Sequence, residues 1–268
     1  MVTYRAILDL PDDLVSFVEN VIATRRGEVR SPWRALTSFD QAVLTLVWLR
    51  DGDTFSQLGR HFGISTDTAW RYATEAMRAL SAQAPTVADA LAKVGPQRRM
   101  ILDGTLVPTH RCAVRPAGYE RENRDPYYSG KHHRPGANVQ ALMGMDGEPA
   151  YVGDARCGST HDLTAAREDQ IIQAAAAAGI EVLADSGYQG AGGTVRTPVK
   201  RPKGLGHNGH EKRANQAHAA ERAPGERGFA LLKSWRVLRL VRISPCRITD
   251  LVRAVLVVTQ KRSSLARG

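Results

Sequence analysis

The chain has 268 residues, of which 43% are hydrophobic and 24% charged, as in globular proteins and unlike fibres or disordered chains. No apolar run has the length of a membrane-spanning helix, and the first thirteen residues lack the basic and then apolar pattern of a signal peptide. The three cysteines are far apart and fit neither a disulfide framework nor a zinc site. We expect a cytoplasmic protein that does not bind membranes.

Positive charge is concentrated near the C-terminal end. The formal net charge is +10, and residues 196–268 hold 17 Lys and Arg against 4 acids, which leaves 20 basic and 23 acidic residues in 1–195. A concentrated basic surface is expected of a partner of polyanions, because each neutralised phosphate releases a counterion. Charge alone fits a merely solvated face equally well.

The first part of the chain is predicted to be helical. Residues 11–24 and 38–50 have helical apolar spacing, and Ser38 is placed to cap the second of these helices. Together with the motif described next, they predict a helical domain over 1–84. Residues 85–98 are expected to link it to a second domain, 99–268.

A helix-turn-helix is predicted at residues 55–72, "FSQLGRHFGISTDTAWRY". Gly59 supplies the small residue at the helix crossing, Gly63 tolerates the positive φ of the turn, and Ser65 can cap the second helix. The side chains that would face DNA are Thr66, Thr68, Trp70 and Arg71. An ordinary three-helix packing unit would show a similar pattern.

The order of elements beyond residue 98 predicts an α/β domain with a mixed sheet. A strand at "MIL" is followed by a hairpin around "DG" at 146–147, a helix over 161–179 and a strand over 180–184. A basic helical region follows from about 208 to 240. Residues 115–136 show no period and are predicted to form a long loop.

Two aspartates follow apolar strands in this second domain. Asp103 comes after "MIL" and Asp185 after "IEVLA", so the two carboxylates converge if the strands are neighbours. Such oxygen ligands suit a hard divalent cation, and two cations about 3.5–4 Å apart can activate a nucleophile and stabilise a leaving oxygen in phosphoryl transfer. Aspartate after a strand is also a common turn former.

A third carboxylate is expected from the basic helical region. Arg222, Glu226 and Lys233 fall within roughly 40° of one another on a continuous helix, whereas Glu221 points about 140° away from Glu226. Pro224 should open or kink the helix just before Glu226, which leaves the direction of Arg222 open. A plain surface ion-pair ladder would have the same spacing.

Five segments follow the helix-turn-helix in this order: "ILDGTLVP", "YYSGKHHRPGANVQAL", "GSTHDLTA", "VLADSGYQG" and "RAPGERGFALLKSWRVL". Together they resemble insertion-sequence transposases of the DDE superfamily, in the branch related to PIF/Harbinger, over residues 37–258. One departure is Ala219, where a related branch has a tyrosine seven residues before the glutamate. Trp235 could compensate by packing or stacking, although a core position suits its spacing better.

The resemblance implies a ribonuclease H-like catalytic domain with the acidic triad Asp103, Asp185 and Glu226. In such enzymes two Mg²⁺ ions, for which Mn²⁺ substitutes, cut DNA and join the strand end to a target. Lys233 would hold DNA phosphate near the scissile bond. The implied partner is double-stranded DNA at element ends and target, bound by a homodimer or a higher oligomer.

Several further residues are candidates for DNA contact or for the site. The segment over 127–134 mixes aromatic and basic side chains that can stack bases and grip phosphates, with Tyr128, Lys131 and His132 as the main candidates and Arg222 as another. His161 and Asp162 begin a helix, where His161 suits a capping role and Asp162 an N-terminal helix charge.

Two classes of function are compatible with these motifs. The first is a transposase that binds terminal inverted repeats and performs metal-dependent cleavage and strand transfer. The alternative is a catalytically inactive or domesticated sequence-specific DNA-binding protein, such as a repressor. The intact carboxylates at 103, 185 and 226 favour the enzyme, but they do not separate strand transfer from simple cleavage.

Overall fold

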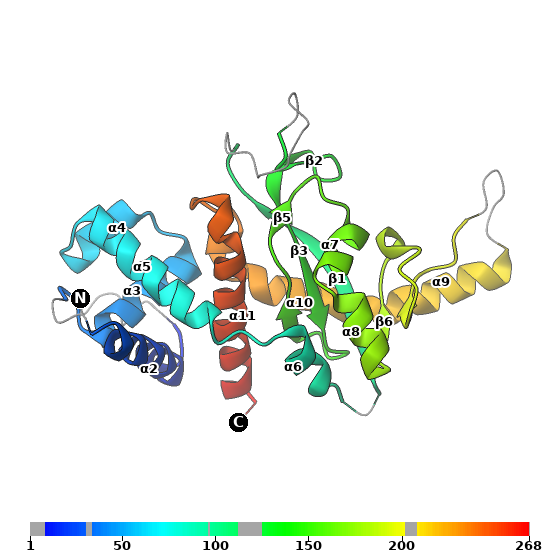
Figure 1. The fold of residues 1–268 in the computed structure, drawn as a ribbon, viewed down its shortest axis with the longest axis horizontal. Helices are drawn as coiled ribbons and strands as arrows, with labels where there is room; N and C mark the ends of the chain where they lie inside the picture. The colour runs from blue at the N-terminus through cyan, green and yellow to red at the C-terminus, as the bar shows by residue number, and fades with distance from the viewer. Residues whose placement is uncertain (1–8, 31–33, 96, 112–124, 202–207, 268) are drawn as a thin grey trace. The chain divides into compact units, whose positions relative to one another are not determined.

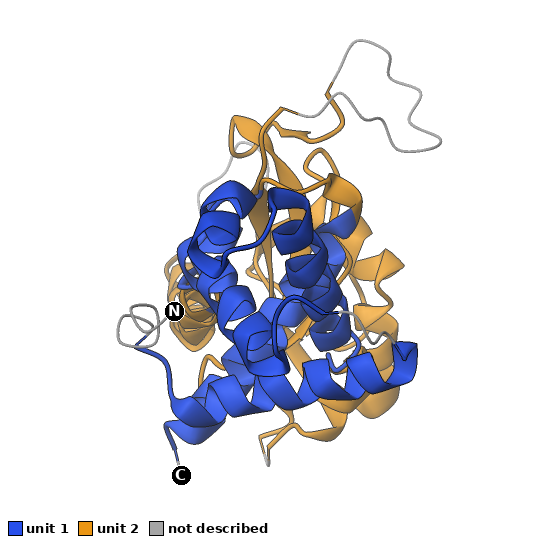
Figure 2. Cartoon of the chain, turned by 90° about the vertical axis from the view of Figure 1, so that its left-hand side faces the viewer, with its two compact units in different colours: residues 1–84, 232–241, 247–268 blue, residues 85–231, 242–246 orange. Residues whose placement is uncertain are grey.

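The computed structural model describes residues 9–30, 34–95, 97–111, 125–201 and 208–267 (Figure 1). The chain forms two compact units, coloured separately in Figure 2. Unit 1 contains residues 1–84, 232–241 and 247–268, and unit 2 contains 85–231 and 242–246. In the described ranges no helix is long and apolar enough to cross a membrane.

Unit 1 is helical, as predicted for its N-terminal part. It contains α2 (Asp12–Val29), α3 (Ser38–Asp51), α4 (Phe55–Phe62), α5 (Thr66–Ser81), the 3₁₀ turn η2 (Arg236–Leu238) and α11 (Ile248–Leu265). The predicted cap of α3 was wrong by one residue. Thr37 has extended backbone and its side chain accepts a hydrogen bond from the Asp40 N–H, so Ser38 is already helical.

The helix-turn-helix is confirmed in α4 and α5. Gly63 ends α4 with φ of 65°, and the Ser65 hydroxyl caps α5 by accepting from the Thr68 N–H. The apolar residues that pack between the two helices are buried or half-buried: Leu58, Phe62, Ile64, Ala69 and Tyr72. Gly59 is required at the crossing, since a Cβ there would lie 2.7 Å from the Ile64 carbonyl oxygen.

We expect Gly59→Ala to lower the free energy of unfolding by about 1–3 kcal/mol, because a backbone carbonyl must move to admit the methyl group. Gly27→Ala is the matched control: Gly27 lies in α2 with nothing within 4 Å of an added Cβ. It should be neutral or stabilising by up to about 1 kcal/mol. Urea unfolding measures both variants, and equal effects would contradict this account of the crossing.

The C-terminal helix belongs to unit 1. Helix α11 packs on α2 and α5, the Ser81 hydroxyl donates to Asp250 at 3.1 Å, and buried Trp235 donates its indole N–H to Thr259 at 2.9 Å. This differs from the predicted division, which assigned all of 99–268 to the catalytic domain. The reason is that α11 is apolar on several sides and nine of its residues are buried, so it requires helices around it.

Unit 2 is built on a mixed sheet, as predicted. The described strands are β1 (Arg99–Pro108), β2 (Tyr128–Ser129), β3 (Arg134–Met143), β4 (Pro149–Val152), β5 (Arg156–Cys157), β6 (Glu181–Leu183) and β7 (Val195–Arg196). Their order is β2-β3-β1-β6-β7, with β4 and β5 also paired to β3. Strand β1 runs antiparallel to β3 and parallel to β6, and β6 runs parallel to β7.

Helices cover both faces of the sheet (Figure 1). One face packs on α6 (Val87–Ala92), α7 (Asp162–Glu168) and α8 (Ile171–Ala178) through a buried apolar cluster that includes Leu102 and Val182. The other face packs on α10 (Pro224–Lys233), which follows α9 (Gly209–Arg222). Gly225 allows this close approach, since a Cβ there would lie 2.9 Å from the Ile101 side chain.

The hairpin around "DG" is confirmed by the antiparallel pairing of β3 and β4, with Gly147 at φ 79° in the turn. The predicted helix over 161–179 is two helices, because the backbone breaks at Gln170, which has φ of 57°. The basic helical region is likewise divided, with Ala223 separating α9 from α10 before Pro224.

The predicted loop over 115–136 was wrong for its last part. Residues 128–136 form a short hairpin in which Tyr128 pairs with Pro135 and Ser129 with Arg134. The strand before Gly130, β2, has only two residues, so it carries no periodic signal that a sequence could show. Residues 112–124 lie outside the described ranges.

Candidate active site

Asp103 lies within β1, and Asp185 lies two residues after the end of β6, the parallel neighbour of β1. Ile101 of β1 pairs with Leu183 of β6, and continuing that register by two residues places Asp103 opposite Asp185. Asp103 was predicted to follow its strand, and this was wrong. It lies within β1, which continues to Pro108 because β3 pairs with it there. Strand β6 has already ended at this level, so both carboxylates lie where the parallel pairing stops.

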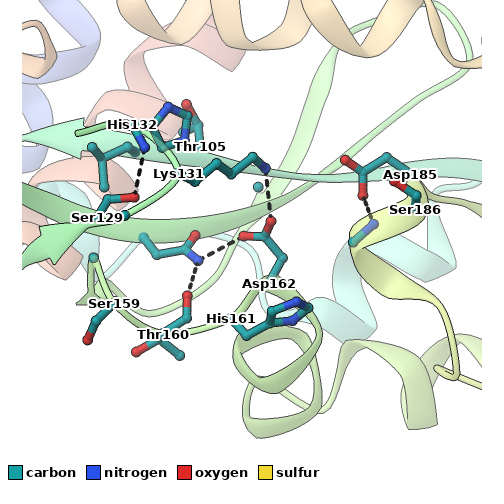
Figure 3. A pocket seen from close by; sticks show the side chains of 16 residues that line it. Thr105, Ser129, Lys131, His132, Ser159, Thr160, His161, Asp162, Asp185 and Ser186 are labelled. Carbon is teal, nitrogen blue, oxygen red and sulfur yellow. Dashed lines mark hydrogen bonds and ion pairs between the residues drawn. The ribbon is translucent and has the colours of Figure 1, made fainter. Parts of the chain in front are cut away.

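A pocket of about 480 Å³ opens beside these residues (Figure 3). Its walls come from β1 after Asp103, from the hairpin tip with Lys131 and His132, from the start of α7 and from the turn after β6. Asp162 and Asp185 are both among its lining side chains. His161 also lines the pocket, and its ring accepts from the Leu163 N–H, which confirms the capping role.

Asp162, predicted only as an N-terminal helix charge, is the centre of a polar network. Its carboxylate accepts from the side-chain amides of Asn138 at 2.8 Å and Gln140 at 3.3 Å, and it pairs with Lys131 at 3.2 Å. The Tyr188 hydroxyl donates to Gln140. Asn138 and Gln140 are buried polar residues at alternate positions of a strand, and buried polar residues require hydrogen-bond partners. These two residues in a mostly apolar strand were the sequence signal that a polar partner lies close by.

Burial and charge set the protonation of this network. Burial raises the pKa of Asp162, but hydrogen bonds from Asn138 and the charge of Lys131 outweigh it, so the pKa is lowered and the carboxylate is ionised. The pKa of Tyr188 lies well above its usual value, first because the ring is buried and then because Asp162, Asp103 and Asp185 are near. Tyr188 therefore remains a hydrogen-bond donor.

The surroundings of Asp103 favour its ionised form less than those of Asp162 do. Burial raises its pKa above the ordinary value and the charge of Asp185 adds to this, whereas Arg222 and the Gly104 N–H act in the opposite direction. Arg222 approaches the carboxylate to 3.4 Å, and its side chain is only 17% exposed. An ionised Asp103 beside Asp185 would gain from a cation in the pocket.

The site fits a divalent cation in part. Asp103 and Asp185 supply two converging carboxylates, the hard oxygen donors that such ions prefer. Glu226 lies exposed in the first turn of α10, and no group of three acidic, histidine or cysteine side chains in the described ranges is arranged to hold a metal. The structure thus brings two of the three predicted ligands together.

The other predicted residues have different surroundings. Lys131 and His132 line the pocket from the hairpin tip, while Tyr128 is 44% exposed. Arg222 turns toward Asp103 from the end of α9, so it shares no continuous helix with Glu226 or with Lys233, which lies in the last turn of α10. Buried Trp235 is a core residue, and Glu221 is paired with Arg99 at 2.6 Å.

On the helix-turn-helix, Thr66 and Arg71 are exposed on α5. Thr68 is half-buried; its hydroxyl accepts from Arg71 at 3.2 Å. These side chains lie at the N-terminal end of the second helix, which is the part that enters the major groove in this motif.

We expect Asp103→Asn to raise the melting temperature near pH 7. Because the folded-state pKa of Asp103 is raised, stability is lost as pH rises through the interval between its ordinary and its raised value, and the neutral amide avoids that loss. A gain of about 1 kcal/mol corresponds to about 2–4 °C in a chain of this size. Scanning calorimetry from pH 7 toward pH 4 should show the difference shrinking; an unstable variant at pH 7 would contradict the assignment.

A mixed sheet with one aspartate within β1 and another just after the parallel strand β6, in a chain with a helix-turn-helix, is the architecture of a ribonuclease H-like enzyme acting on DNA. The family model described as DDE superfamily endonuclease matches residues 102–260, and the model for the helix-turn-helix of DDE superfamily endonuclease matches 34–86. The chain therefore belongs to the DDE superfamily of transposases, with an N-terminal DNA-binding helix-turn-helix.

A curated relative supports this membership. The chain is 31% identical over 232 residues to a putative transposase for insertion sequence element IS112 from Streptomyces albus G, covering 84% of this chain and 78% of the relative. No solved structure matches the chain significantly. Endonucleases of this superfamily generally use divalent metal ions, which agrees with the carboxylates of Asp103 in β1 and Asp185 after β6.

Proposed function

We propose that this protein is an active transposase that binds the terminal inverted repeats of its element, cleaves the DNA strand there and joins the freed 3′ end to a target. The observation that carries the proposal is the register of β1 and β6, which sets Asp103 and Asp185 side by side next to one pocket. A repressor has no use for paired, partly buried carboxylates at this cost in stability.

Asp103, Asp185 and Glu226 are the proposed ligands of two Mg²⁺ ions, with Mn²⁺ as a substitute. When bound, such ions activate the attacking oxygen and stabilise the leaving oxygen of a phosphoryl transfer. Glu226 lies in the first turn of α10, directly after Gly225. Gly225 packs on Ile101, which is two residues before Asp103 in β1.

The chain's own cations are proposed to hold the DNA. Asp162 directs the Lys131 ammonium into the pocket (Figure 3), where it can contact a phosphate; His132 and Tyr128 extend this contact from the same hairpin. Arg222 and Lys233 are proposed to contact phosphates along α9 and α10. Thr66, Thr68 and Arg71 are proposed to read the terminal repeat, with two or more copies of the chain acting on two element ends.

The test is cleavage and joining of a labelled duplex that carries the element's own end. Wild-type protein should give cut and joined products in Mg²⁺ and in Mn²⁺, and none with a chelator. Specific binding without any product in either metal would replace this proposal by the inactive DNA-binding protein. Cut product without joined product would reduce it to a nuclease.

A further inference from the structure

A basic groove lies beside the helix-turn-helix within unit 1. It has a volume of about 290 Å³ and is lined by four arginines that come from three parts of the chain: Arg25 of α2, Arg71 and Arg78 of α5, and Arg247 just before α11. The remaining lining residues are Trp70, Thr74 and Glu75. The arginines therefore gather from segments more than 200 residues apart in the sequence.

The acidic residues near the groove do not cancel this charge. Glu75 is occupied by Arg34, which donates to both carboxylate oxygens at 2.7 and 2.8 Å. Glu28 pairs with Arg25 at 2.9 Å, but both side chains are about half exposed, and such surface pairs contribute little. Counting Arg34, five guanidinium groups face two carboxylates, so the groove has an excess of positive charge.

Trp70 and Arg247 form the most specific feature of the groove. The Arg247 guanidinium lies over the Trp70 ring, 5.0 Å from its centroid, and its Nη1 is buried without a hydrogen-bond partner in the described part of the chain. Trp70 is 38% exposed, which is unusual for so large an apolar ring. The ring thus fixes the position of the guanidinium in the wall of the groove.

The position of the groove indicates its ligand. Arg71 and Arg78 are seven residues apart on α5, a rise of about 10 Å, so the two guanidinium groups can reach different phosphates of one DNA strand. Arg71 also belongs to the surface proposed to read bases. A DNA strand whose bases contact α5 would therefore have its phosphates next to these arginines. A compact acidic ligand would not need cations spread over this length.

We propose that this groove binds the DNA phosphate backbone beside the bases read by α5, so that Arg247 and the C-terminal segment complete the DNA-binding unit. The inference rests on the proposed function, in which the helix-turn-helix binds element ends. It goes further because it assigns DNA contact to residues outside the motif and assigns Trp70 the task of positioning Arg247.

The experiment measures the affinity of the full chain for two labelled duplexes, the element end and a scrambled sequence of equal length, over a series of salt concentrations. Arg25→Ala, Arg78→Ala and Arg247→Ala should each weaken both duplexes several-fold and reduce the salt slope by about 1. Arg239→Ala, an exposed arginine of the same unit that does not line the groove, should change neither. Arg247→Lys keeps the positive charge and should therefore keep most of the salt dependence of wild type. It is the control that separates loss of charge from loss of folding in Arg247→Ala.

Unchanged affinity and slope in the three groove variants, while Thr68→Ala weakens the element end, would overturn the groove and leave the helix-turn-helix assignment intact. Equal binding of both duplexes by wild type would overturn terminal-repeat recognition. The groove proposal would still be tested by comparing the affinities of wild type and the groove variants for the scrambled duplex. In a double-mutant cycle, Trp70→Ala should remove most of the effect of Arg247→Ala; additive losses would contradict the positioning role.

Discussion

Asp185→Asn is expected to lower metal-dependent cleavage of the element end by about 10³-fold or more and to leave DNA affinity within about twofold of wild type. The carboxylate lies opposite Asp103 when the register of β1 and β6 is continued, and it lines the pocket. In the proposed mechanism its charge would act on the reacting phosphate through bound cations and would contribute little to DNA binding. Cleavage rates and binding isotherms on the same duplex measure the two effects separately.

Asp103→Asn provides the internal control for this result. It should lose cleavage to a similar extent although its fold is expected to be more stable than that of the wild type near pH 7, so unfolding cannot account for the loss. Calorimetry of the same samples tests this, and Mg²⁺ should raise the melting temperature of the wild type more than that of either variant. Normal cleavage by either variant would refute the assignment of the carboxylate pair.

Glu226→Gln should also reduce cleavage by about 10³-fold or more, whereas Asp162→Asn should reduce it by about 10–100-fold, as substitutions that disturb the support of a ligand do. The reason is that Asp162 is already occupied by Asn138 and Lys131, while Glu226 is exposed and available. Single-turnover cleavage rates of the two variants, measured side by side, decide which carboxylate completes the site.

Glu221→Gln is the matched control, because it makes the same substitution near the end of α9. Glu221 pairs with Arg99, which should give a small stability effect and near-normal cleavage. The opposite ranking, with Asp162→Asn inactive and Glu226→Gln active, would assign the third ligand to Asp162 and require α10 to serve DNA binding instead.

Short-range signals made the helix-turn-helix predictable. Gly63 and Ser65 act through their own backbone and the next turn of helix, so the sequence contains the whole cause of the structure there. The same holds for the β3–β4 hairpin, where Gly147 adopts positive φ, and for the break at Pro224. Where a local preference was nearly balanced, as between Thr37 and Ser38, the boundary was wrong by one residue.

Contacts between distant segments could not be read in this way. The sequence placed Asp103 and Asp185 at apolar strands, but only the parallel pairing of β1 with β6 makes them neighbours. Asp162, at the start of α7, was missed because its partners Asn138 and Gln140 come from strand β3, more than 20 residues earlier in the chain. Likewise, α11 packs on α5 because several of its sides are apolar. The sequence of α11 does not indicate which helices cover these sides.

The sequence by itself determined the family, the order of elements, the helix-turn-helix and the residue types that a phosphoryl-transfer site needs, because each follows from motif order or from interactions within a few residues. The tertiary structure alone decided that Asp103 and Asp185 become neighbours, that Arg222 turns toward Asp103, and that Arg247 packs on Trp70 of the recognition helix. Those outcomes depend on strand pairing and helix packing across more than 80 residues, where burial of apolar surface rather than local preference selects the partners.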